Sequence, residues 1–535
     1  MNCSELMVRY LKEAGIDHVF GYPGDPSVPF LEACRTADMS FVLATREGTA
    51  GLMAEAYGQL TDKPGVFLST LGPGSSNTVN AVASAYLDRA PMIAIAGQIE
   101  TRREALFTHQ VIDHNRVFAP ISKWSVGINP HTVGGVMRRA LRLSVSERPG
   151  PIHISTPGDF VGADAVETEI RLPPLAADVE GGLVWGGVEK LAARIASARR
   201  PIILAGMSAV RGRATPGVTR LAETLGAPVV ATPVGKGAID ETHPYFAGTV
   251  DMACNKFIWD FLKSGDLIIA VGFDAVELIK PWTVSVPVVH IDSVPNTDQI
   301  YEAEMEAVGP IPALLDALQP ALRIEGARWT EAEIAAHRRA LRGNYLAGGV
   351  QGRLNPTDVV ETVLAASSAE TTITSDVGSH KLLVGQGWVA QRPKSVLMSN
   401  GLSSMGYGLP AAMTASLLER ERDVVCFTGD GGLAMVAGEL RTASTLKLGG
   451  LTVVVFCDNS LNRIELKQLA RQYPSFGTTI EPTDVPMLAA SMDCEGVGVS
   501  SVRELEAALA GRDRRSDRPL VIAANIDPAQ YAAQF

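Results

Sequence analysis

The sequence predicts an α/β protein of three domains, in which parallel sheets are flanked by helices. Short apolar runs alternate with helical patterns throughout the chain, and the runs end in turn residues, as buried parallel strands do. The alternation occurs in three sets, which two irregular stretches separate at residues 171–187 and 323–356. A chain of 535 residues, 46% of them hydrophobic, is long enough for three domains of ordinary size with buried cores.

The apolar runs mark the expected strands of each domain in turn. We expect an N-terminal domain over 1–170, a middle domain over 188–322 and a C-terminal domain over 352–535. The runs are 64–72, 91–98 and 151–159 in the first domain, 199–209, 227–238, 266–277 and 286–293 in the second, and 371–380, 422–432 and 451–460 in the third. Ligands of open parallel sheets gather outside the carboxyl ends of the strands, so the motifs after these runs are candidates for function.

Composition narrows the classes of function. The net charge of −11 and the absence of a basic block make nucleic acid an unexpected partner. No run of about 18 apolar residues occurs, so we expect no membrane span. The six cysteines form no CxxC pair, and the N-terminal "MNCSELMVRYLKEAGI" lacks the basic start and apolar core of a signal peptide. We therefore expect a cytoplasmic protein with reduced thiols that acts on a small molecule.

The stretch "FTGDGGLAM" places a carboxylate, Asp430, in a glycine-rich turn between a buried strand and a helix. Such a turn favours an anion, and a carboxylate beside an anion requires a cation between them. Mg²⁺ bridging to a phosphate fits, because it is a hard ion with oxygen ligands. Residues 432–457 separate the GDG sequence from an Asp-Asn pair, 458–459, in the stretch "FCDNSLN" at the end of the next expected strand. There Asn459 offers an amide oxygen and Leu461 a backbone carbonyl. By itself, a GDG sequence is more often a tight turn.

These two motifs together resemble the metal–diphosphate motif of thiamine diphosphate-dependent enzymes, with Asp458 in place of the first Asn of the family pair. The resemblance covers the whole chain, and its three domains match the pyrimidine-binding, middle and diphosphate-binding order of the family. The segments at 71–77, 375–381 and 399–412 are similar to acetolactate synthase. The resemblance implies metal ligands at Asp430, Asn459 and Leu461, and cofactor contacts at Gly24, Asn77, Gly378, Ser379, His380, Ser403, Met405, Gly429, Gly431, Gly432 and Asn459, where Met405 holds the cofactor in its V shape.

Glu47 matches the glutamate that activates the cofactor in this family. It lies at a strand end in "SFVLATREGTAGLMAEAYGQL" and opens a helix of small and apolar residues. Its task requires an apolar site in which burial raises the carboxyl pKa. Taken alone, a glutamate at a helix start is more often a cap or a partner of the helix dipole.

The residues expected on the substrate side resemble more than one subgroup of the family. Asp25, in "GYPGDPSVPF", resembles a catalytic aspartate of pyruvate decarboxylases, although it also suits a turn before proline. The His109–Gln110 pair resembles carboxyethylarginine synthase, and His109 could move protons near neutral pH. His114 is expected to be structural or exposed. Glu465 stands where pyruvate decarboxylases have a catalytic glutamate, with a solvent-facing helix residue paired to Lys467 or Arg463 as the alternative.

The resemblance implies decarboxylation of a 2-oxo acid and ligation of the enamine intermediate to a carbonyl acceptor, as in acetolactate synthase. Two alternatives stay open: a non-oxidative decarboxylase that releases an aldehyde, and a catalytically silent cofactor-binding subunit. The family places its active sites between subunits, which implies a homodimer or homotetramer. FAD is possible but not favoured, because "LAGMSAVRG" and "VGFDAVE" in the middle domain contain no GxGxxG.

Overall fold

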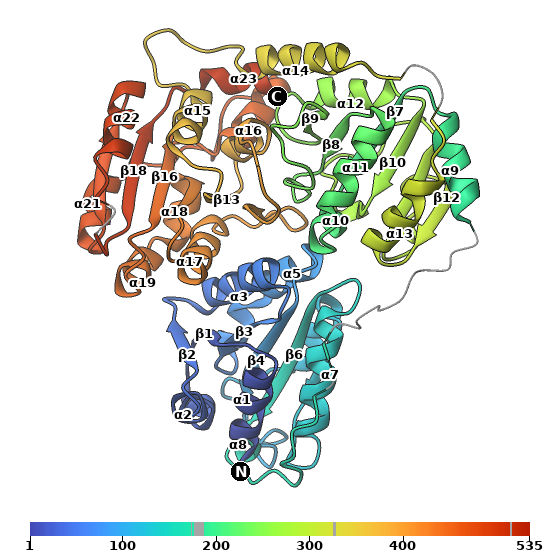
Figure 1. Cartoon of the computed structure of the whole chain (residues 1–535). Coiled ribbons are helices and arrows are strands. Elements are labelled where there is room, and N and C mark those ends of the chain that lie inside the picture. The colour runs from blue at the N-terminus through green and yellow to red at the C-terminus, as the bar shows by residue number, and fades with distance from the viewer. Residues whose placement is uncertain (173, 176–186, 325–327, 514–515) are drawn as a thin grey trace. The chain divides into compact units, whose positions relative to one another are not determined.

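The computed structural model describes residues 1–172, 174–175, 187–324, 328–513 and 516–535. In these ranges the strands form three six-stranded sheets whose neighbouring strands are all parallel (Figure 1). The predicted fold class is therefore confirmed. The irregular stretch at 171–187 lies mostly outside the described residues. None of the helices in the described ranges is long and apolar enough to cross a membrane.

The N-terminal sheet has the strand order β2-β1-β3-β4-β6-β5. Helix α3 (Glu47–Thr61) packs beside it and contacts α17 (Gly408–Leu418), where the hydroxyl of Thr414 donates to the Met53 carbonyl at 3.2 Å. The C-terminal part of the sequence thus completes this compact unit with two segments, Leu402–Glu419 and Val436–Leu446. The other elements are β1 (His18–Tyr22), β2 (Ser40–Leu43), β3 (Gly65–Ser69), β4 (Met92–Gln98), β5 (Trp124–Gly127), β6 (Pro151–Pro157), α1 (Cys3–Glu13), α2 (Val28–Thr36), α4 (Pro73–Asn77), α5 (Val79–Leu87), α6 (His114–Phe118), α7 (Val133–Val145), α8 (Gly158–Val161) and α19 (Glu439–Thr445).

The middle sheet has the order β12-β11-β10-β7-β8-β9. From β7 the chain adds β8 and β9 on one side of the sheet, and it then adds β10, β11 and β12 on the other side. The topological switch point therefore lies between β7 and β10, as in dinucleotide-binding sheets. Its elements are β7 (Pro201–Ala205), β8 (Val229–Ala231), β9 (Phe246–Thr249), β10 (Leu267–Val271), β11 (Val288–Asp292), β12 (Ala303–Val308), α9 (Val188–Ser197), α10 (Met207–Arg211), α11 (Thr215–Leu225), α12 (Asn255–Lys263), α13 (Ile311–Leu318) and α14 (Glu331–Tyr345).

The C-terminal sheet, ordered β14-β13-β15-β16-β18-β17, repeats the N-terminal order when its strands are counted along the chain. Strands β13, β15 and β16 are neighbours, and the motifs at 375–381, 427–435 and 456–462 follow them directly. Parallel strands therefore bring these motifs to one edge. The elements are β13 (Thr372–Ser375), β14 (Val396–Met398), β15 (Val424–Gly429), β16 (Leu451–Cys457), β17 (Glu495–Val499), β18 (Leu520–Asn525), α15 (Pro356–Ala366), α16 (Ser379–Gly387), α18 (Asp430–Val436), α20 (Asn462–Ala470), α21 (Val485–Ser491), α22 (Val502–Ala510) and α23 (Tyr531–Gln534).

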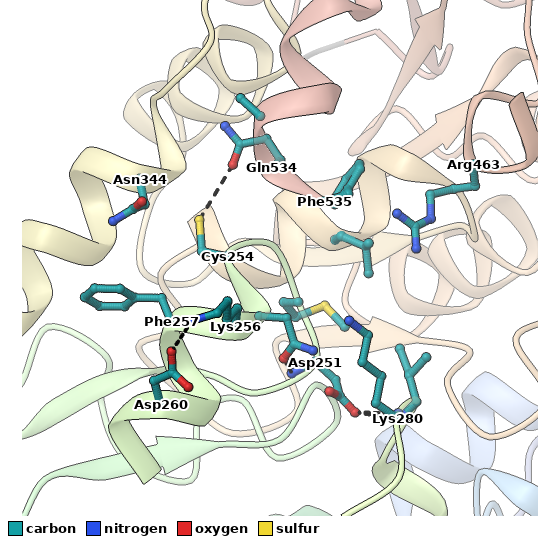
Figure 2. Close-up of a pocket in the computed structure, with 15 residues that line it drawn as sticks. Asp251, Cys254, Lys256, Phe257, Asp260, Lys280, Asn344, Arg463, Gln534 and Phe535 are labelled. Atoms are coloured by element: carbon teal, nitrogen blue, oxygen red, sulfur yellow. Dashed lines mark hydrogen bonds and ion pairs between the residues drawn. The ribbon is translucent and has the colours of Figure 1, made fainter. Parts of the chain in front are cut away.

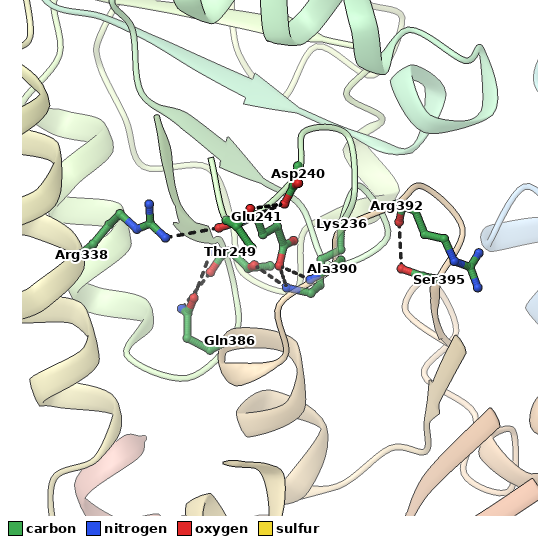
Figure 3. A network of polar contacts seen from close by, with 10 residues as sticks. Lys236, Asp240, Glu241, Thr249, Arg338, Gln386, Ala390, Arg392 and Ser395 are labelled. Carbon is green, nitrogen blue, oxygen red and sulfur yellow. Dashed lines mark hydrogen bonds and ion pairs between the residues drawn. The ribbon is translucent and has the colours of Figure 1, made fainter. Parts of the chain in front are cut away.

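A buried polar network joins the middle and C-terminal sheets within the second compact unit (Figure 3). The ammonium of Lys236 lies 2.8 Å from a carboxylate oxygen of Glu241, and both side chains are almost inaccessible to solvent. The same oxygen of Glu241 accepts the amide of Ala390 at 2.8 Å. Gln386 donates to the carbonyl of Thr249 and accepts its amide, each at 3.1 Å. These contacts replace water around buried polar groups, which apolar packing alone could not do.

Candidate functional site

The predicted site residues fall into two groups, one in each compact unit. The unit built on the N-terminal sheet carries Gly24, Asp25, Glu47, Asn77, His109, Gln110, Ser403 and Met405. The unit built on the middle and C-terminal sheets carries Gly378, Ser379, His380, Gly429, Asp430, Gly431, Gly432, Asn459, Leu461 and Glu465.

Asp430 lies at the carboxyl end of β15, where its carboxylate links two neighbouring strand ends. One oxygen accepts the amide of Gly431 at 2.7 Å, and the other accepts the amide of Asn459 at 2.8 Å. Burial raises the pKa of Asp430 in spite of these hydrogen bonds. Burial, together with the charge of Asp430, also raises the pKa of Asp458 to about 7. Two acids that oppose each other's ionisation form a place that a cation would stabilise.

The three expected metal ligands differ in how well the structure suits them. Asn459 is exposed and takes a left-handed backbone conformation with φ of 56°, which turns the chain beside Asp430. The Leu461 carbonyl already accepts the amides of Ile464 at 2.8 Å and Glu465 at 3.1 Å, so it fits least well. The described residues contain no group of three or more His, Cys, Asp or Glu side chains that could hold a metal. The expected metal ligands would not form such a group, because they are one carboxylate, one side-chain amide and one backbone carbonyl.

The start of α16 and the β15 turn form a cradle for an anion. The ring of His380 is buried, its Nε2 has no partner in the structure, and burial lowers its pKa to about 3, so the ring is neutral. A Cβ on Gly429 would lie 3.3 Å from Cε1 of this ring, which shows how closely the turn approaches it. The hydroxyl of Ser379 donates to Asn462 at 2.7 Å and fixes the helix start. A glycine turn beside a helix start, next to a buried ring nitrogen without a partner, could hold a diphosphate.

Asp376 is a buried residue of this cradle that the sequence did not single out. Its carboxylate accepts the hydroxyl of Thr428 at 3.1 Å. A Cβ on Gly432 would lie 2.4 Å from the same carboxylate, so only glycine fits there. The available signal was its position in the segment 375–381, "SDVGSHK".

Glu47 begins α3 and contacts the loop that contains α4. One carboxylate oxygen accepts the side-chain amide of Asn77 at 3.2 Å, and the other lies 3.0 Å from the position that a Cβ on Gly74 would take. The carboxylate is only half-buried in this unit. The apolar surroundings expected for it are therefore not supplied by this unit alone.

Glu439, at the start of α19, holds the backbone around Glu47. One of its oxygens accepts the amide of Thr45 at 3.0 Å, the hydroxyl of Thr45 at 2.6 Å and the hydroxyl of Thr49. Glu439 is fully buried, and its other oxygen has no partner in the structure. Glu439 has no local signal in the sequence, because its contacts join segments almost 400 positions apart.

The substrate-side residues of this unit are mostly open to solvent. Asp25 is exposed and begins a short 3₁₀ turn, Asp25–Ser27, while His109 and Gln110 belong to an exposed stretch over 101–110. His114 is buried, accepts the amide of Gly72 at 3.3 Å, and has its pKa lowered to about 4 by burial. It is therefore a structural residue.

The backbone conformation and the packing at Gly24 and in the segment before α17 restrict which residues fit at these positions. A Cβ on Gly24 would lie 2.0 Å from the Thr70 hydroxyl, so this close approach requires glycine. Ser403 has a left-handed backbone with φ of 55°, and the hydroxyl of Ser404 donates to Asn80 at 2.9 Å. Met405 is half-buried, so it is not a core methionine.

Glu465 lies on α20, behind the Asn459 turn. Its carboxylate accepts the hydroxyl of Ser460 at 2.6 Å. The expected alternative, an ion pair with Lys467 or Arg463, is not formed among the described residues. A hydrogen bond to the turn keeps the carboxylate beside the candidate metal site.

At the switch point of the middle sheet, Glu277 forms hydrogen bonds with the start of α10. Glu277 is fully buried and accepts the amide of Met207, at the start of α10, at 2.8 and 2.9 Å and the hydroxyl of Thr232 at 2.5 Å. A Cβ on Gly206 would lie 2.5 Å from this carboxylate. Burial raises the pKa of Glu277 to about 8.

Three family descriptions match the chain. They are the N-terminal TPP binding domain of thiamine pyrophosphate enzymes at residues 1–117, the central domain at 188–318 and the C-terminal TPP binding domain at 376–524. The chain is 30% identical to a catabolic acetolactate synthase of Raoultella terrigena over 536 residues, which cover 98% of this chain and 95% of the relative. It is 28% identical to an acetolactate synthase of Bacillus subtilis over 539 residues, or 98% and 93% of the two chains. It is also 28% identical to the large subunit of acetolactate synthase isozyme 2 of Escherichia coli, over 98% and 96%.

Proposed function

Because the chain belongs to the thiamine diphosphate-dependent enzymes, in their acetolactate synthase-like subgroup, we propose that it decarboxylates a 2-oxo acid and joins the remaining carbons to a carbonyl acceptor. The observation that carries the proposal is the edge of the C-terminal sheet. There the Asp430 carboxylate meets the Asn459 turn beside the orphaned Nε2 of His380. The enzyme requires Mg²⁺ and acts in the cytoplasm.

Each residue has a distinct task in this proposal. When bound, thiamine diphosphate supplies the carbanion chemistry and the electron sink for decarboxylation. Asp430 and Asn459 would hold Mg²⁺, and the start of α16, which carries Ser379 and His380, would hold the diphosphate. Glu47 would hold a proton at the pyrimidine nitrogen, and the hydrogen bond from Asn77 orients its carboxylate. Glu439 fixes the backbone on both sides of Glu47 through Thr45 and Thr49.

The active form in this proposal is a homodimer or homotetramer whose sites lie between subunits. The half-buried Glu47 and the exposed stretch over 101–110 support it, because a partner subunit would supply the missing cover. In such a site Gln110 would bind the carbonyl or carboxylate of the substrate, and His109 would move a proton. We do not include flavin, because the side chain of Glu277 already lies at the start of α10, at the switch point of the middle sheet.

A non-oxidative decarboxylase is the second candidate. The contact between Ser460 and Glu465 favours it, because it holds the Glu465 carboxyl group beside the candidate metal site. Asp25, His109 and Glu465 would then protonate the product, and an aldehyde would leave.

Cofactor-dependent release of CO₂ tests the shared part of both candidates. The purified protein is assayed with pyruvate and larger 2-oxo acids, with and without thiamine diphosphate and Mg²⁺. We expect CO₂ only when both are present, and a loss of about 100-fold or more in Asp430→Ala, because the metal bridge to the diphosphate is removed. Release of CO₂ without the cofactors, or full activity of the variant, would contradict the proposal.

A further inference from the structure

A cavity of about 470 Å³ lies within the second compact unit, between elements of the middle and C-terminal sheets, and is open to solvent (Figure 2). Its size is that of a small-molecule site. The loop and helix at 251–260 form one side, while Lys280, Arg463 and α23 form others. None of the residues assigned to the cofactor or substrate lines it.

Three cations and two carboxylates line this cavity, and both carboxylates are already engaged. Asp251 accepts the indole N–H of Trp259 at 3.0 Å and the amides of Ile279 and Lys280 at 2.6 and 3.0 Å. Asp260 pairs with the ammonium of Lys256 at 2.6 Å. Among the described residues, the side chains of Lys280 and Arg463 have no acidic partner. Lys280 and Arg463 are therefore the two cations of the lining that form no ion pair among the described residues.

The two cations without an acidic partner border the same cavity. Figure 2 shows Lys280 and Arg463 among the side chains that line it. The guanidinium stacks on the ring of Phe535 at 4.5 Å, which supports its face and leaves the N–H groups at its edge available. Two cations match a dianion better than a monoanion.

We propose that this cavity, the Lys280–Arg463 pocket, binds a small organic phosphate whose dianionic phosphoryl group lies between Lys280 and Arg463. The guanidinium suits phosphate because it can donate two parallel hydrogen bonds, while the ammonium adds a point charge. The organic part lies along Met252 and Leu382. Leu382 belongs to α16 and Arg463 to α20, the helices that also carry His380 and Glu465, so an occupant would contact the supports of the cofactor site.

Titration calorimetry on the protein saturated with thiamine diphosphate and Mg²⁺ tests this site and is independent of turnover. Phenyl phosphate is the probe, benzoate is the monoanionic control and phenol is the neutral control. We expect phenyl phosphate to bind about tenfold or more tightly than benzoate, and phenol to show no binding. Equal affinity for the three probes, or no binding of phenyl phosphate, would overturn the proposal.

Matched variants locate the binding. Lys280→Gln and Arg463→Gln should each weaken phenyl phosphate about tenfold or more, and Lys280→Arg should retain most of the affinity. Lys263→Gln, an exposed residue of α12 outside the pocket, should leave the affinity unchanged. Unchanged affinity in both pocket variants would show binding elsewhere and would also overturn the proposal.

Discussion

Lys236→Met tests the buried ion pair that joins the middle and C-terminal sheets. The Lys236 and Glu241 side chains are 0% and 1% exposed, and the substitution removes the cation 2.8 Å from the carboxylate (Figure 3). The Ala390 amide remains as a donor to one oxygen, and the other oxygen of Glu241 has no partner in the structure. Breaking a buried pair in this way costs about 3–5 kcal/mol, because a buried charge is left uncompensated.

The cost should depend on pH. Burial raises the pKa of Glu241, and Lys236 opposes that rise. For an acid with a raised pKa in the folded state, the stability contribution is present below the ordinary pKa and is lost as pH rises through the folded value. Without Lys236 the folded pKa is higher still, so the loss continues to a higher pH. The destabilisation of Lys236→Met should therefore be larger at pH 8 than at pH 6.

Thermal unfolding followed by circular dichroism measures this effect. Because a protein of several domains is not two-state, the midpoint is compared rather than a free energy. We expect a fall of about 5–10 °C at pH 8 and a smaller fall at pH 6. The double variant Lys236→Met/Glu241→Gln keeps an acceptor for Ala390 without the charge, and it should recover most of the loss. An equal fall at both pH values, or no recovery in the double variant, would refute the reasoning.

Three further predictions concern the cofactor site. Glu47→Gln should lower kcat about 10²–10⁴-fold with an unchanged circular dichroism spectrum, because it removes the proton-holding group; near-normal kcat would exclude this role. Gly432→Ala should weaken thiamine diphosphate binding in calorimetry, because its Cβ would lie 2.4 Å from the Asp376 carboxylate, whereas Gly343→Ala, with nothing within 4 Å, should bind normally. Mixing inactive Glu47→Gln and Asp430→Ala chains should restore activity if sites are shared, and no recovery after confirmed subunit exchange would count against shared sites.

The fold and the proximity of Asp430 to Asn459 could be predicted from the sequence because both depend on local patterns. Strands β15 and β16 are continuous apolar runs, and parallel pairing brings the polar residues after them, Asp430 and Asn459, together. Strands such as β12 and β17 were not identified, because their side chains alternate between buried and exposed and give no apolar run.

Other parts of the site depend on contacts between distant segments and left no local signal. Glu439 reaches Thr45 and Thr49 across the chain, and Glu277 reaches the start of α10 from another strand end. Before folding, both are ordinary glutamates near helices. The exposure of His109 and Gln110 likewise depends on what covers them, which no spacing within one chain encodes.

The reaction itself is tested most directly by product analysis. The purified protein is incubated with thiamine diphosphate, Mg²⁺ and pyruvate, and the products are followed by NMR. A carboligase acting on pyruvate should form acetolactate, or acetoin after its decarboxylation, as the main product. Acetaldehyde as the main product would contradict ligation and would favour the decarboxylase.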